Sequence, residues 1–148
     1  MLRALLLALL LCQAAPAMAQ RIEMHTGTAV PPQGYAHQPR QGRDSFPGSF
    51  VRTGDGFTVH YDIGWIAGLQ MGPHRRAECV WYVEHEVGGI PAFTGMIEEE
   101  GRRRIITTIG DGPPTQSSPA NFTAYVGGDR DVAEFMVIVA SYVPKPGS

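Results

Sequence analysis

The side chains best suited to chemistry in this sequence are His60, Asp62 and His85. His60 and Asp62 are two residues apart, so an extended backbone places both on one face of a strand. Imidazole and carboxylate groups hold a metal when two to four of them converge. No spacing here matches a zinc or calcium motif, and a regular strand points His85 away from its neighbours Glu84 and Glu86. A metal site therefore requires the fold to bring separate strands together; otherwise these are solvated polar residues near strand ends.

Cys79 is the second candidate for chemistry, as a nucleophile or as a packed core residue. The pattern Cys79-x-Trp81-x-Val83 is typical of the apolar face of a strand, where a thiol packs as a small hydrophobic group. A reactive thiolate needs a nearby base, but His85 lies about 20 Å further along an extended strand. We expect Cys79 to be a core residue. Since the Gly-x-Ser-x-Gly motif is also missing from the sequence, we predict no catalytic residue and no cofactor.

A glycine-containing apolar segment is the best candidate for a partner surface. Gly64, Gly68 and Gly72 recur every four residues, which in a membrane helix forms a packing seam. Asp62 and Pro73 bound the segment, so a strand that leaves into a bent loop fits better. The apolar residues of this region are Tyr61, Trp65, Ile66, Leu69 and Met71. Such a loop faces either the core or a partner.

The N-terminus predicts export. A positive charge at Arg3, an apolar run from Ala4 to Leu11 and the small residues Ala17 and Ala19 are the parts of a signal peptide. The apolar run is too short to span a bilayer, which needs roughly 20 apolar residues. We predict that residues 1–19 are cleaved. The mature chain is then periplasmic or secreted and meets a membrane only during export.

Composition narrows the classes of function further. Removal of residues 1–19 leaves 129 of the 148 residues, enough for one domain. Without Arg3, 11 basic residues face 14 acidic ones, which argues against a nucleic-acid partner because phosphate binding needs a basic excess. Cys79 is the one cysteine of the predicted mature chain, so packing rather than an internal disulfide must stabilise it.

Three regions follow the signal peptide. Residues 20–48 are rich in Pro, Gly, Gln and His and lack apolar periodicity, so we expect an arm that is flexible or laid across the domain. Residues 49–143 form a single β domain. Residues 144–148 contain two prolines and are expected to be a disordered tail.

Alternation of apolar and polar residues predicts strands in the β domain. Period two is clearest from Phe57 to Trp65, and Phe122–Val126 shows a shorter run. Residues 79–87 and 90–98 form a hairpin in which Gly88-Gly89 is the two-residue turn, because both central residues of such a turn take positive φ. With this turn, Val87 pairs with Ile90, which places Val83 opposite Thr94 and Trp81 opposite Met96.

The following hairpin allows two registers. A three-residue loop pairs Glu99 with Arg103 and Ile97 with Ile105, which matches charge to charge and apolar to apolar. A two-residue loop instead sets Ile97 against Arg104. We favour the first register because its cross-strand pairs match in charge and in hydrophobicity.

The segment 132–143 is compatible with a strand or a helix. Asp131 can cap a helix, but the run Phe135–Ala140 is rich in Val and Ile, which favours a central buried strand. With this strand the fold class is all-β: an antiparallel sandwich-like domain, or a small open barrel, of six to seven strands.

These features favour an exported protein of the bacterial envelope that is a non-enzymatic binding or structural module. Its partner is an unidentified envelope protein or a second copy of the chain meeting an uncovered sheet face. The alternative is a metal-binding protein or enzyme that uses His60, Asp62 and His85. Convergence of these three side chains favours the alternative; their scatter, with an exposed apolar patch from Trp65 to Met71, favours the binding module.

Overall fold

The computed structural model describes residues 19–110 and 118–145, so the predicted signal peptide lies almost entirely outside the described residues. The larger strands are β3 (Tyr35–Pro39), β4 (Phe46–Arg52), β5 (Thr58–Ile63), β6 (Trp81–Val87), β7 (Ile90–Glu99), β8 (Arg102–Ile109) and β9 (Ala120–Val126). The remaining elements are β1 (Ile22–Met24), β2 (Gly27–Ala29), β10 (Val143–Pro144), the helix α2 (Asp129–Ala140) and the 3-10 helices η1 (Trp65–Ala67) and η2 (Pro73–Glu78).

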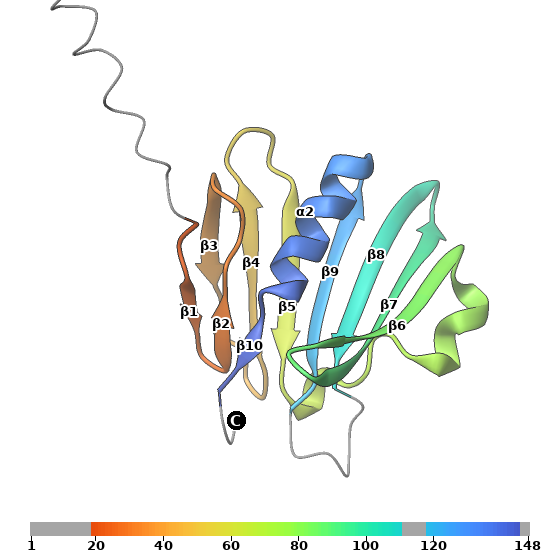
Figure 1. Cartoon of the computed structure of the whole chain (residues 1–148), viewed down its shortest axis with the longest axis horizontal. Coiled ribbons are helices and arrows are strands. Elements are labelled where there is room, and N and C mark those ends of the chain that lie inside the picture. Colours follow the sequence, from red (N-terminus) through yellow and green to blue (C-terminus); the bar gives the residue numbers. More distant parts are fainter. Residues whose placement is uncertain (1–18, 111–117, 146–148) are drawn as a thin grey trace, which may run out of the picture.

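Two antiparallel sheets make a sandwich-like arrangement (Figure 1). The large sheet has the order β3-β4-β5-β9-β8-β7-β6 and stays open, with β3 and β6 at its edges. The small sheet has the order β1-β2-β10. The small sheet and α2 cover the same face of the large sheet, which we call the core face; the opposite face is the outer face. The predicted all-β sandwich class is confirmed; in the described residues the α-helix α2 packs against it in addition.

Alternation along β5 explains how the core face forms. Val59, Tyr61 and Ile63 point to the core and are at most 5% exposed. On the neighbouring strand, Phe122 lies opposite Tyr61 and is fully buried. Its ring meets that of Tyr142 edge to face, with 5.5 Å between the centroids, which joins the large sheet to the segment after α2.

The first predicted hairpin register is confirmed: Val87 lies opposite Ile90, and Gly88 and Gly89 both have positive φ. The second predicted register is wrong, because Ile97 lies opposite Arg104 across a two-residue turn. The turn residues Glu100 and Gly101 have φ of 51° and 73°, the positive values that match the twist of a hairpin. The preference of the turn therefore outweighs the side-chain matching across the strands.

The prediction that Phe135–Ala140 is a central strand is wrong, since these residues belong to α2. The buried Phe135 and Val139 and the partly buried Val132 and Met136 are spaced at three and four residues, the period of one helix face. The Asp131 carboxylate, in the first turn of α2, accepts a hydrogen bond of 2.8 Å from the Gly127 amide just before the helix, while the N-cap residue is Gly128, without a side-chain capping bond. Tertiary packing of this face overrides the β preference of Val and Ile.

Strands also occur in the two segments expected to lie outside the domain. Residues 20–48 contain β1, β2 and β3, and Met24 and Ala29 lie in the hydrophobic core. At the other end of the chain Pro144, in β10, pairs with Gly27 of β2, while residues 146–148 lie outside the described residues. Each of these strands has only two to five residues, too few to show periodicity in the sequence.

Candidate functional site

The segment between β5 and β6 crosses the outer face of the large sheet. Met71, in its middle, is fully buried and packs with Ile97 and Ile106 in a second, smaller core. Three large apolar side chains before it point to solvent instead, with exposed fractions of 49% for Trp65, 73% for Ile66 and 37% for Leu69. We call these three residues the apolar tip.

Buried hydrogen bonds hold the base of the apolar tip. Asn121 and Thr108 on the outer face are at most 1% exposed. The Asn121 side-chain amide donates to the Gly68 carbonyl at 2.8 Å, and its oxygen accepts from the Gln70 amide at 3.2 Å. The Thr108 hydroxyl donates to the Asn121 oxygen at 2.6 Å and accepts from the Met71 amide at 2.8 Å. Because these polar groups are satisfied inside the protein, the loop is held in one conformation.

Two glycines let the chain turn on either side of η1. Gly64 has φ of 139° and lies against the backbone of Ser45, and Gly68 has φ of 64°. Both values lie where residues with a side chain are strained, so glycine is required at these positions. The result is a one-turn helix that presents Trp65 and Ile66 outward on a fixed base.

Of the five residues predicted as a partner surface, three form the apolar tip and two do not. Tyr61 is 5% exposed and points into the core face, where its hydroxyl lies 2.8 Å from Nε2 of His37. Met71 is buried under the loop. The alternation of β5 explains Tyr61, since this residue shares a face with Val59 and Ile63.

The predicted metal ligands are separated. His60 and Asp62 share the outer face of β5, whereas His85 lies on the core face of β6, where its Nε2 is 2.8 Å from the Thr94 hydroxyl. Four strand spacings separate β5 from β6, roughly 19 Å. Within the described residues no group of three His, Cys, Asp or Glu side chains is placed to hold a metal ion.

The surroundings of His60 carry further positive charge. Burial, and then the charges of Arg40 and Arg104, lower the pKa of His60. Ser49 lies directly opposite His60, and its hydroxyl and Oδ1 of Asp62 are buried without a hydrogen-bond partner among the described groups. Two guanidinium groups near one imidazole oppose the binding of a cation at this position.

Cys79 lies at the end of the segment between β5 and β6 and packs against Met71 in the smaller core. Its sulfur lies 3.8 Å from the Met71 sulfur and 3.4 Å from the Arg75 carbonyl. A Cβ at Gly95 would approach the sulfur to 2.7 Å, so β7 needs a glycine there. Burial raises the pKa of the Cys79 thiol, and an inert thiol in a small core is consistent with the predicted packing role.

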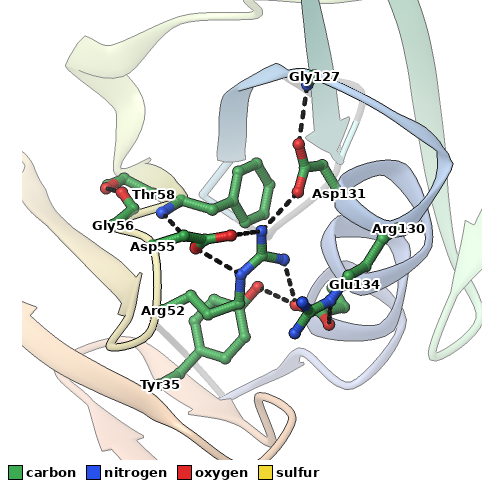
Figure 2. Close-up of polar contacts among 10 residues, drawn as sticks. Tyr35, Arg52, Asp55, Gly56, Thr58, Gly127, Arg130, Asp131 and Glu134 are labelled. Carbon is green, nitrogen blue, oxygen red and sulfur yellow. Dashed lines mark hydrogen bonds and ion pairs between the residues drawn. The ribbon is translucent and has the colours of Figure 1, made fainter.

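A cluster around Arg52 joins α2 to the β4–β5 turn (Figure 2). Arg52 is 6% exposed, and its guanidinium binds Asp55 through two nitrogens, at 2.7 and 2.6 Å. It also binds Asp131 and Glu134 of α2, each at 2.7 Å. Tyr35 completes the cluster with a 2.6 Å hydrogen bond to Glu134. Four of the five N–H donors of Arg52 bind these carboxylates, so the cluster fastens the helix to the β4–β5 turn.

The cluster shifts the titration of its acidic members. Burial alone would raise the pKa of Glu134, but hydrogen bonds from Tyr35, Arg52 and Arg130 lower it to about 2. The Arg52 hydrogen bonds lower the pKa of Asp55 to about 2 as well. No spacing in the sequence indicates this cluster, because its members come from three elements distant in the chain.

Comparisons with known proteins show similarity of fold only. No protein-family model matches this sequence, and no curated protein matches it. A protein of Bacteroides thetaiotaomicron VPI-5482, with a crystal structure at 1.50 Å resolution, has a similar fold with a TM-score of 0.51 and 16% sequence identity. The similarity covers 88% of this chain and 51% of that protein, so this chain spans about half of its length.

Proposed function

We propose that this protein is an exported binding module of the bacterial envelope and that it contacts a partner protein through the apolar tip. The observation that carries the proposal is the exposure of Trp65, Ile66 and Leu69 on a loop whose base is held from within. The signal-like N-terminus supports the envelope as its location. In the described part of the chain no helix is long and apolar enough to cross a membrane.

The energetics of the apolar tip suit a contact surface. Full burial of a side chain as large as Ile or Leu contributes roughly 1.5–3 kcal/mol. A loop that already has its bound conformation loses little conformational entropy on association, so more of this free energy remains as affinity. Tryptophan is also among the residue types that dominate the energy of protein interfaces.

The separation of His60 and Asp62 from His85 also supports a binding module over a metal enzyme. His60 and Asp62 share the outer face of β5, and the positive charges of Arg40 and Arg104 act on His60 there. His85 is engaged with Thr94, which in turn bonds the Thr107 hydroxyl at 2.7 Å. This separation supports the binding module, because the alternative needs the three side chains to converge.

The test is capture of a partner by the mature chain, residues 20–148, from periplasmic extract of the source bacterium, with cross-linking and mass spectrometry. The double variant Trp65→Ser, Ile66→Ser should recover the partner at least about tenfold less well, since tenfold corresponds to 1.4 kcal/mol. Val137→Ser is the matched control, because Val137 is 51% exposed on α2, on the other face of the sheet. Equal recovery by the double variant and the wild type would contradict the proposal.

Light scattering on the purified mature chain identifies the case in which the partner is a second copy. A dimer that the double variant converts to a monomer, and that Val137→Ser leaves intact, places the contact on the apolar tip. A dimer that both variants retain would assign self-association to another surface.

A further inference from the structure

A cleft lies between the small sheet and the β3–β4 edge of the large sheet, away from the apolar tip. Its volume is about 410 Å³. Cavities that hold small molecules in proteins usually measure roughly 300–1,000 Å³. The uncharged part of its lining includes Met24, His25, His37, Phe46 and Tyr61. The cleft is therefore large enough for a small molecule, and the chemistry of its lining indicates which kind.

The two charged residues of the lining, Glu23 and Arg40, turn their side chains away from the cleft. Alternation along β1 points Glu23 to solvent, because its neighbour Met24 lies in the core. The same alternation puts Arg40 on the outer face, three residues beyond His37 on the core face. Burial lowers the pKa of His37, so its imidazole is neutral at pH 7. The lining therefore offers no charge to replace the water that an ion would lose on entering.

One wall of the cleft is aromatic and joins the two sheets. The rings of His25, in the β1–β2 turn, and Phe46, at the start of β4, stack with 3.7 Å between centroids and 17° between planes. Phe46 is nevertheless 40% exposed, so the stack leaves ring surface open. Pro39 and Pro47 add apolar surface to the lining. A wall of this kind suits a planar apolar ring.

The floor of the cleft carries a buried hydroxyl group that retains hydrogen-bonding capacity. Tyr61 is 5% exposed, and its hydroxyl lies 2.8 Å from Nε2 of His37, with no second partner among the described side chains. If Nε2 accepts, the Tyr61 oxygen can still accept from a ligand; if Nε2 donates, the Tyr61 hydroxyl can donate to one. A ligand hydroxyl group, which both donates and accepts, fits either arrangement. Gly48 makes room for the Tyr61 hydroxyl, since a Cβ there would collide with it.

We propose that the cleft binds an uncharged aromatic molecule that carries a hydroxyl group, a ligand of the phenol class. Its ring lies against the His25–Phe46 stack, and its hydroxyl group bonds Tyr61 at the floor. The lack of a facing charge disfavours organic acids and amines, and the buried hydroxyl disfavours plain hydrocarbons. This site goes beyond the proposed protein contact, because the apolar tip lies over the outer face of the large sheet and shares no residue with the lining of the cleft.

The test is calorimetric titration of the mature chain with p-cresol and two compounds of similar size. Toluene lacks the hydroxyl group, and 4-methylbenzoate carries a carboxylate in its place. Toluene should bind at least about fivefold more weakly than p-cresol, because it leaves the Tyr61 hydroxyl without the added partner. The benzoate should bind at least about tenfold more weakly, since its carboxylate would lose water without meeting a charge. No binding of p-cresol at millimolar concentration, or an equal affinity for either of the other compounds, would overturn the proposal.

Two variants, each with a control, place the binding in the cleft. Tyr61→Phe should lower the affinity for p-cresol at least about fivefold and leave that for toluene unchanged, because it removes only the hydroxyl group. Tyr125→Phe is its matched control, since the Tyr125 hydroxyl bonds Glu99 on the outer face. Phe46→Ala should weaken p-cresol and toluene alike, because it removes the apolar wall. Val137→Ala, at a similarly exposed position on α2, should weaken neither.

Chemical denaturation verifies that each variant is folded. Phe46→Ala changes an exposed side chain, so it tests the cleft even where Tyr61→Phe is destabilised. An unchanged affinity for p-cresol in either cleft variant, or an equal loss in its control, would contradict the proposal.

Discussion

The Arg52 cluster and the end of β3, where Arg40 lies, use the same charged group in opposite ways. Arg52 is buried and meets Asp55, Asp131 and Glu134, so four of its five N–H donors are used inside the fold. Arg40 is exposed and meets no acid among the described residues. The comparison shows that a guanidinium bonded to several carboxylates inside the fold holds elements together, whereas one without such partners stays open to a ligand.

Loss of the Arg52 guanidinium should have the largest effect on stability. Arg52→Leu leaves Asp131 without its cation and Glu134 with only the exposed Arg130, and we expect the free energy of unfolding to fall by about 2–3 kcal/mol. This is below the 3–5 kcal/mol typical of fully buried pairs, because the acids retain contact with water. Chemical denaturation measures it, with Arg40→Leu as a control that should change stability by less than about 0.5 kcal/mol. Equal losses in the two variants would remove the distinction between the two regions.

The Asn121 side chain should have the next largest effect. Asn121→Leu removes the hydrogen bonds to Gly68 and Gln70, and a lost buried partner costs about 1–3 kcal/mol. Hydrogen exchange should accelerate at the amides of Gln70 and Met71, while the amides of β4 and β5 keep their protection. Unchanged exchange at these two amides would show that the apolar tip is held by other contacts.

Acid should weaken the Arg52 cluster in a defined pH window. The folded pKa of Glu134 is about 2, below its ordinary value of 4.5, so its contribution is present above pH 4.5 and is lost as the pH falls toward 2. Glu134→Gln should flatten the dependence of stability on pH in this window. An unchanged acid transition in the variant would show that other carboxylates cause it.

The contact between His37 and Tyr61 on the core face should respond to pH in a higher window. Burial lowers the folded pKa of His37, so the unfolded chain takes up a proton first and stability declines as the pH falls below 6.5. His37→Gln should reduce this slope, because only the contribution of His60 then remains, while it keeps a side chain able to bond Tyr61. A slope that persists unreduced in His37→Gln would place the titration elsewhere.

The smallest effect is expected at the tip of the β7–β8 hairpin. Arg103 is exposed and lies opposite Glu98, and exposed ion pairs contribute less than about 1 kcal/mol. Arg103→Glu should therefore shift the free energy of unfolding by less than about 0.5 kcal/mol, well under the loss for Arg52→Leu. A larger loss would mean that charge at the protein surface also holds elements together.

The sequence predicts correctly those strands and turns that are indicated by local residue patterns. The alternation around Val59 and Tyr61 and the turn at Gly88-Gly89 are local signals, and the structure confirms both. The helix α2 was missed because Val137, Ile138 and Val139 are β-branched, although the spacing of Phe135 and Val139 fits a helix. Its stability comes from packing on the sheet, which a single segment does not reveal.

The two candidate sites differ in how far the sequence indicates them. Trp65, Ile66 and Leu69 stand close together in a glycine-containing segment, so the apolar tip could be predicted. The cleft between the small sheet and the β3–β4 edge could not be predicted, because its lining residues Glu23, His25 and Arg40 fall in a segment without periodicity that was expected to be an arm. Only the pairing of the short strands β1, β2 and β3 brings these residues together.

The position of β2 between β1 and β10 has a consequence for the topology of the chain. Ile22 and Val143 flank neighbouring residues of β2, Ala29 and Thr28, so they lie about two strand spacings, roughly 10 Å, apart. A linker of a few residues spans that distance. A circular permutant that joins Ile22 to Val143 through such a linker and opens the chain at the exposed turn of Gly88 and Gly89 should therefore reach the same fold, because the pairing of the described strands is kept.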